Sequence, residues 1–183
     1  AASTQTGGDG IGGGGVYIES SSSSPSPVQN VSLSNLTFEG NSAVNGRGGA
    51  FYRSGNVTVT VWNSSLTSNS ALKGGGFYLG AGSSSMRLTR LVSNKGTSNG
   101  GGLMIEGMEM LTVRNCTLQS NDAATSGGGV FVSGQAILQA QDTLYSNNVA
   151  RGSSDTEGGG ALYISDTAVV TSTNDRYSNN QAT

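Results

Sequence analysis

The sequence predicts an all-β fold in which short strands stack coil upon coil as a parallel β-solenoid. Three observations predict it: small-residue clusters recur about every 26 residues, apolar and polar residues alternate with period two around them, and no segment of ten or more residues has helical spacing. A strand this short cannot form a sheet alone. Coils stacked about 4.8 Å apart complete one another's backbone hydrogen bonds.

The repeat has two markers. Small triplets lie at residues 13–15, 48–50, 74–76, 100–102, 127–129 and 159–161. The second marker is a column of Asn residues, which is expected to form a hydrogen-bonded amide ladder at a turn: Asn41, Asn69, Asn94, Asn121, Asn147 and Asn179. Two markers with one period of about 26 residues indicate a single-stranded β-helix of six to seven coils.

We expect one continuous solenoid segment over residues 1–183. Two longer intervals coincide with polar insertions, a Ser/Pro-rich loop at 19–28 and a polar loop at 150–157. The composition of both insertions is typical of surface loops, which lengthen the interval without changing the coils of the solenoid. The glycines are expected where the chain needs a positive φ or where neighbouring walls approach closely. The segment is expected either to belong to a longer solenoid or to stack head to tail.

Equivalent positions after each triplet form columns. Two columns are predicted to fill the core: Val16, Phe51, Phe77, Leu103, Val130 and Leu162, and Ile18, Arg53, Leu79, Ile105, Val132 and Ile164, in which Arg53 is a misfit. The column between them is then expected outside as an aromatic ladder: Tyr17, Tyr52, Tyr78, Met104, Phe131 and Tyr163. An exposed apolar row marks an interface, for self-association or for a sugar. The alternative is the opposite orientation of the strands, in which the aromatic column faces the core and the other two columns face outward.

The composition argues against most catalytic and metal sites. The chain has no His and one Cys, which excludes His-based triads, His metal sites and thiolate zinc sites. Glu19 and Glu106 share a column, but three coils separate them by roughly 14 Å, too far for a catalytic carboxylate pair. We therefore expect no catalytic residue, cofactor or metal. Cys116 is expected to be a buried hydrophobe, with a reactive thiol as the alternative.

Charge and hydropathy limit the classes of partner that the chain is expected to bind. The nine basic residues show no cluster along the sequence, which argues against nucleic-acid binding. No run of 18 apolar residues is present, which argues against a membrane span in this segment.

The segment from Phe38 to Phe51 carries an aromatic-x-x-Asn element followed by Gly-Gly-Ala-aromatic. It resembles the paired F-x-x-N and G-G-A-I repeats of the chlamydial polymorphic outer-membrane proteins, a type also found in right-handed parallel β-helix proteins of algae and bacteria. Other residues are assigned to the Phe position in later coils: Leu66, Leu91, Leu118, Leu144 and Arg176. The resemblance implies a right-handed, surface-exposed or secreted β-helix, often adhesive or structural.

Two kinds of glycosylation site are expected. The SPSP segment is similar to hydroxyproline-glycosylated segments of green-algal wall and flagellar-surface proteins, so Pro25 and Pro27 are candidates; a plain exposed linker is the alternative. The N-x-S/T pattern occurs at Asn30, Asn35, Asn56, Asn63 and Asn115.

These patterns favour an extracellular or cell-surface structural protein without catalytic activity. We expect it to build a fibre, wall or surface appendage by stacking end to end or packing laterally, with further copies, other surface proteins or a glycan as partners. Two alternatives stay open: an adhesin that binds a protein or glycan through the aromatic ladder, and a polysaccharide-active enzyme.

Overall fold

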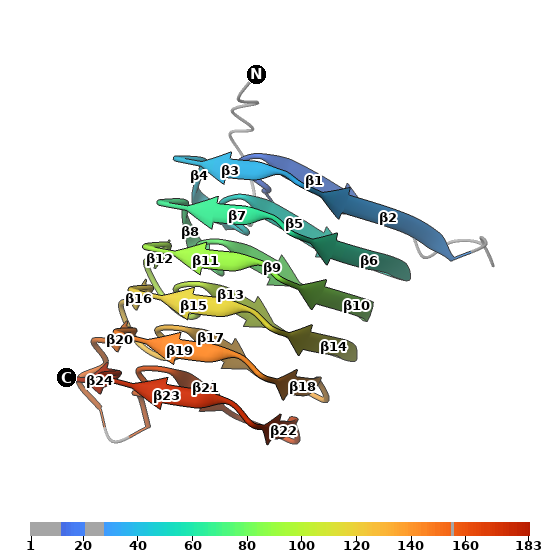
Figure 1. Ribbon diagram of the computed structural model, residues 1–183. Coiled ribbons are helices and arrows are strands. Elements are labelled where there is room, and N and C mark those ends of the chain that lie inside the picture. Colours follow the sequence, from blue (N-terminus) through green and yellow to red (C-terminus); the bar gives the residue numbers. More distant parts are fainter. Residues whose placement is uncertain (1–11, 21–27, 155) are drawn as a thin grey trace.

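The computed structural model describes residues 12–20, 28–154 and 156–183. In these residues the chain forms four parallel sheets of six strands each, and Figure 1 shows the coils stacked in chain order. The predicted parallel β-solenoid is confirmed, with about 27 residues per turn. Each coil, called a rung below, contributes one strand to every sheet, so rung 1 holds β1–β4 and rung 6 holds β21–β24.

The chain visits the sheets in a fixed order, A to B to C to D. Sheet A consists of β1 (Val16–Glu19), β5 (Phe51–Ser54), β9 (Phe77–Leu79), β13 (Leu103–Ile105), β17 (Val130–Val132) and β21 (Leu162–Ile164). Sheet B consists of β2 (Gln29–Ser34), β6 (Val57–Trp62), β10 (Gly82–Arg87), β14 (Glu109–Arg114), β18 (Ile137–Gln141) and β22 (Val169–Thr173).

The other two sheets have shorter strands. Sheet C consists of β3 (Thr37–Glu39), β7 (Ser65–Thr67), β11 (Arg90–Val92), β15 (Thr117–Gln119), β19 (Leu144–Ser146) and β23 (Arg176–Ser178). Sheet D consists of β4 (Ser42–Arg47), β8 (Ser70–Lys73), β12 (Lys95–Gly96), β16 (Asp122–Ala123), β20 (Val149–Ala150) and β24 (Gln181–Ala182).

The interior follows from the alternation within each strand. Along β6, Val57, Val59 and Val61 are buried, and the residues between them face outward. Sheet A contributes the two predicted core columns in the predicted register, for example Val16 opposite Phe51. In sheet D the inward position is small, and Ala71, Ala123 and Ala150 are buried there. Burying these apolar columns is the main favourable term for the fold.

Positive φ recurs at the corners of the rungs, and at two of these corners every described rung has it. The corner between sheets B and C uses the column Asn35, Asn63, Leu88, Asn115, Asp142 and Asn174. The corner between sheets C and D uses the column Gly40, Ser68, Ser93, Ser120, Asn147 and Asn179. Gly, Asn and Asp tolerate this conformation best, which explains their recurrence at corners.

The glycine triplets serve both purposes expected of them. The first glycine turns the chain from sheet D into sheet A, as at Gly74 with a φ of +65°. The second lies against the next rung: a Cβ on Gly75 would stand 2.4 Å from the carbonyl oxygen of Gly101. No side chain fits at that distance, so small residues recur at a fixed phase.

Candidate functional site

The aromatic column of sheet A lies beneath a second layer of chain, so the prediction that it forms an exposed ladder is wrong. Tyr52 is 3% exposed and Tyr78 is 4% exposed, and Met104 and Phe131 are also buried. Together they form a small apolar cluster separate from the main core, with Tyr163 packed at its edge. Of the predicted face, Tyr17 in rung 1 stays exposed, at 42%.

The cover comes from the segments that turn from sheet D into sheet A. A Cβ on Gly127 would stand 2.8 Å from the Cβ of Phe131, and the Arg47 guanidinium lies 5.1 Å from the centre of the Tyr78 ring. The rings also cover one another: Tyr52 and Tyr78 stack with centroids 5.2 Å apart and planes 9° apart. The Tyr78 hydroxyl donates to Glu106 at 2.6 Å, and burial, then this contact, raise the pKa of Tyr78. The column therefore contributes packing, which is worth several kcal/mol per aromatic ring.

A shallow cleft of about 300 Å³ marks the place where this cover opens. Its lining includes Phe131, Tyr163, Asn99, Thr125 and Glu157. This is the lower limit of the volume of most small-molecule sites.

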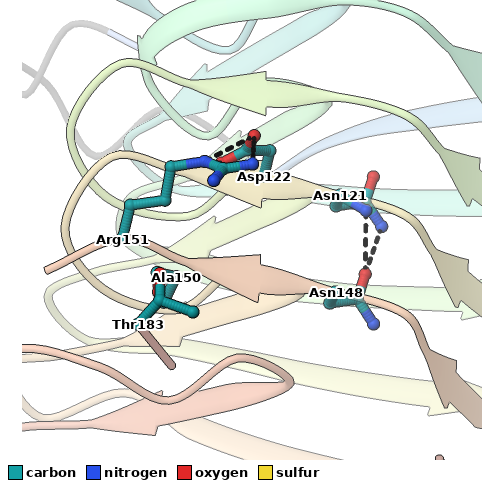
Figure 2. Close-up of polar contacts among 6 residues, drawn as sticks. All are labelled: Asn121, Asp122, Asn148, Ala150, Arg151 and Thr183. Carbon is teal, nitrogen blue, oxygen red and sulfur yellow. Dashed lines mark hydrogen bonds and ion pairs between the residues drawn. The ribbon is translucent and has the colours of Figure 1, made fainter. Parts of the chain in front are cut away.

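The Asn ladder is present at the corner where the chain enters sheet D. Asn121 donates from Nδ2 and from its backbone N–H to Oδ1 of Asn148, at 2.9 and 3.0 Å (Figure 2). The same links join Asn41 to Asn69, Asn69 to Asn94, Asn94 to Asn121, and Asn148 to Asn180. The predicted members Asn147 and Asn179 are wrong, because these residues occupy the positive-φ turn just before the ladder.

The same one-residue slip affects the aromatic-x-x-Asn element. Tyr145 follows Leu118 in the inward column of sheet C, and Tyr177 follows Tyr145 with ring centroids 4.8 Å apart. The assignment of Leu144 and Arg176 to this position is therefore wrong. Rung 6 holds an aromatic residue there like rung 1, and Tyr177, which is 44% exposed, stacks on Tyr145.

The misfit Arg53 is explained by a buried ion pair. Arg53 Nη2 lies 2.6 Å from Oε1 of Glu109, and both side chains are fully buried. Arg53 starts in rung 2 and reaches rung 4, donating on the way to the Ala81 carbonyl and the Ser84 hydroxyl. Space for it comes from Gly82, where a Cβ would stand 2.5 Å from Nη1. Burial raises the pKa of Glu109 above its usual range, and Arg53 opposes part of that rise.

A family comparison agrees with this architecture. The family model described as a right-handed β-helix region matches residues 8–183. The chain belongs to this family. We found no matching relative among curated proteins and none among solved structures. Right-handed β-helices occur in polysaccharide-active enzymes and in proteins without catalytic activity, so membership does not separate these two classes.

The five candidate N-glycosylation sites lie on the outside of the β-helix. Asn30, Asn35, Asn56, Asn63 and Asn115 are all exposed. Three of them occupy the corner between sheets B and C, where the Nδ2 of Asn63 donates to Oδ1 of Asn35 at 2.8 Å. Pro25 and Pro27 lie outside the described residues, as does most of the predicted loop at 19–28.

The carboxylates of the β-helix are spread over several rungs, and many support local structure. Asp122 pairs with Arg151 at 2.9 Å on the outside of sheet D (Figure 2). Glu157 accepts N–H groups of its own loop, Asp166 accepts from the backbone of Gly134, and Asp175 accepts from the backbone of Thr143. Among the described residues, no three His, Cys, Asp or Glu side chains gather where they would hold a metal ion. No helix in the described part of the chain is long and apolar enough to cross a membrane.

We expect Cys116 to react with a thiol reagent only after the β-helix unfolds. The side chain is buried, its sulfur lies 3.3 Å from the Arg114 carbonyl oxygen, and burial raises the pKa of the thiol to about 11. The nucleophilic thiolate is therefore scarce at about pH 8. Absorbance during reaction with a disulfide reagent, with and without denaturant, measures this. Complete reaction of the native protein within the mixing time would contradict it.

Proposed function

We propose that this β-helix is an extracellular structural module, a building block of a fibre, wall or surface appendage, which acts without catalysis. The observation that carries the proposal is the continuous stacking of rungs. Four sheets hydrogen-bond every rung to the next, the Asn ladder adds a side-chain link at each step, and Arg53 joins rung 2 to rung 4.

This arrangement suits a load-bearing role. Interstrand hydrogen bonds run across the strands, which in a solenoid is the direction of the stacking axis. A force along that axis therefore loads the bonds of all four sheets together.

An extracellular location is part of the proposal. It is supported by the resemblance of the repeat to chlamydial polymorphic outer-membrane proteins and by the exposure of all five N-x-S/T asparagines. The Ser/Pro-rich loop, similar to glycosylated algal wall segments, is consistent with the same location.

Self-association by stacking is part of the proposal. Each sheet grows by one parallel strand per rung, and a strand of a further copy would pair in the same way. Unpaired strand edges are templates for pairing with another chain. An adhesin that binds through the aromatic column is not proposed, because that column is buried.

Electron microscopy and sedimentation velocity over rising protein concentration test this function. We expect rods longer than one six-rung unit. Ala182→Lys places a charge at the inward position of the edge strand β24 and should suppress these rods. Thr112→Lys, on the outer face of sheet B, is the matched control and should leave their length unchanged. Single particles at every concentration would overturn the proposal.

A further inference from the structure

The outer corner between sheets B and C gathers charge and apolar surface over rungs 2 to 4. The five residues are called the basic corner below: Trp62, Arg87, Leu88, Arg90 and Arg114. All five are exposed, Trp62 by 45% and Leu88 by 47%. The basic residues are scattered along the sequence, and the coiling of the chain brings these three together.

The register of sheet B sets the spacing of the basic corner. Trp62, Arg87 and Arg114 end strands β6, β10 and β14 and lie directly opposite one another. Neighbouring members are therefore about one strand spacing apart, roughly 4.8 Å. Arg90 starts β11 on the other side of the turn, in the same rung as Arg87. The result is a row of one ring and two guanidinium groups, flanked by a third cation.

Among the described residues, these arginines have no paired counter-charge. In the described part of the chain, no carboxylate oxygen lies within 4.0 Å of Arg87, Arg90 or Arg114. The nearest acid in the turn column is Asp142, one rung beyond Asn115. Like charges directly opposite each other in a sheet are unfavourable. A chain of net charge −2 therefore holds an uncompensated positive site at this corner.

Leu88 is a second, independent sign of a binding surface. It has a φ of +52° at a turn where every other rung has Asn or Asp. Left-handed backbone costs an aliphatic residue about 1–2 kcal/mol, and Leu88, which is 47% exposed, packs only in part against its neighbours. Strain of this kind is characteristic of functional sites. Leu88 instead adds apolar surface between Arg87 and Arg90.

We propose that the basic corner binds a linear anionic polysaccharide, one that carries sulfate or carboxylate groups. Arginine forms bidentate, charge-assisted contacts with such groups. The face of Trp62 suits the apolar face of a sugar ring, because its indole offers a flat apolar surface with a polar edge. One sugar unit advances an extended polysaccharide by a length similar to the rung spacing, so successive anionic groups meet successive rungs.

Nucleic acid fits the basic corner less well than a polysaccharide. Its binding relies on many phosphate contacts, and three arginines supply few of them. The proposal goes beyond the structural function and is tested separately from it. A glycan attached at Asn63 or Asn115, in the same turn column, would cover the site, so the protein is tested without glycosylation.

The single tryptophan of the chain supplies a direct measurement. Trp62 fluorescence is titrated with dextran sulfate, with polygalacturonate, with neutral dextran and with a single-stranded oligonucleotide. We expect a saturable change with one or both anionic polysaccharides and none with neutral dextran. The two polysaccharides distinguish sulfate from carboxylate as the bound group. Affinity should fall as salt rises, because the charges are exposed.

Three variants distinguish a site from general attraction. Arg87→Gln/Arg114→Gln should weaken binding by about tenfold or more. Arg151→Gln removes an exposed arginine that already pairs with Asp122, and binding should not change. Leu88→Asn installs the residue of the other rungs, so it should raise the thermal midpoint while weakening binding. The change in midpoint shows that this variant is folded.

Three outcomes would overturn the proposal. The first is no fluorescence change with either anionic polysaccharide. The second is an equal loss of affinity in Arg151→Gln and in the double variant. The third is tighter binding of the oligonucleotide than of both polysaccharides, which would identify the corner as a nucleic-acid surface.

Discussion

Asn148→Ala is expected to destabilise the β-helix by about 3 kcal/mol or more, because each buried polar group left without a partner costs about 1–3 kcal/mol. Asn148 is fully buried, and its Oδ1 accepts two hydrogen bonds from Asn121. Its Nδ2 donates to the Leu118 carbonyl and to Oδ1 of Asn180, both at 2.9 Å. Alanine removes all four contacts, and its apolar methyl group cannot replace them.

The neighbouring residue supplies a matched control. Asn147 is exposed, has a φ of +54° and takes the place that Ser120 takes in rung 4. Asn147→Ser should therefore change the free energy of unfolding by about 0.5 kcal/mol or less. Urea unfolding followed by circular dichroism measures both variants. Equal losses at 147 and 148 would contradict the ladder as described.

The period of the repeat could be predicted from the sequence, but its phase in two rungs could not. Rungs 5 and 6 both read Ser-Asn-Asn, and either Asn agrees with a period of about 27 residues. The aromatic-x-x-Asn spacing resolves the choice, since Tyr145 precedes Asn148 by three residues as Phe38 precedes Asn41. Because side chains alternate in a strand, a shift of one residue exchanges an inward Tyr for an outward Leu.

The burial of both faces of sheet A could not be predicted from alternation alone. Period two indicates that one face of a strand is buried and leaves the other face undetermined. In β9, β13 and β17 all three residues are buried, because the glycine turns cross the outer face. The glycines beside each aromatic residue were the signal: small residues allow two layers of backbone to approach closely.

The contacts between distant rungs were beyond single-sequence reasoning. Arg53 and Glu109 are 56 residues apart, and Trp62 and Arg114 meet only through the register of β6, β10 and β14. The sequence did mark Arg53 as a misfit in an apolar column. Its partner is identified only by the structure, in which the small residues Gly82 and Ser84 leave a path for the Arg53 side chain through rung 3.

Arg53→Leu is expected to destabilise the β-helix by about 3–5 kcal/mol, because it leaves the buried carboxylate of Glu109 without its partner. Glu109 accepts from Arg53 at 2.6 Å, and its other oxygen, Oε2, has no partner among the described residues. Leu is the residue of the next rung in the same column, at position 79, so the backbone accepts it without strain. Urea unfolding measures the loss.

The double variant Arg53→Leu/Glu109→Val separates two contributions of Arg53 to stability, its ion pair with Glu109 and its filling of space in rung 3. Val is the residue at position 57 in the Glu109 column, and the double change removes both buried charges together. Replacing a buried ion pair by apolar residues is often neutral, so we expect the double variant to recover about 2 kcal/mol or more of the loss in Arg53→Leu. The single variant Glu109→Val is measured as well, and a double-variant loss equal to the sum of the two single losses would instead show that Arg53 stabilises the β-helix by filling rung 3. In that case the charge of Glu109 would be incidental, because no coupling energy would remain to assign to the ion pair.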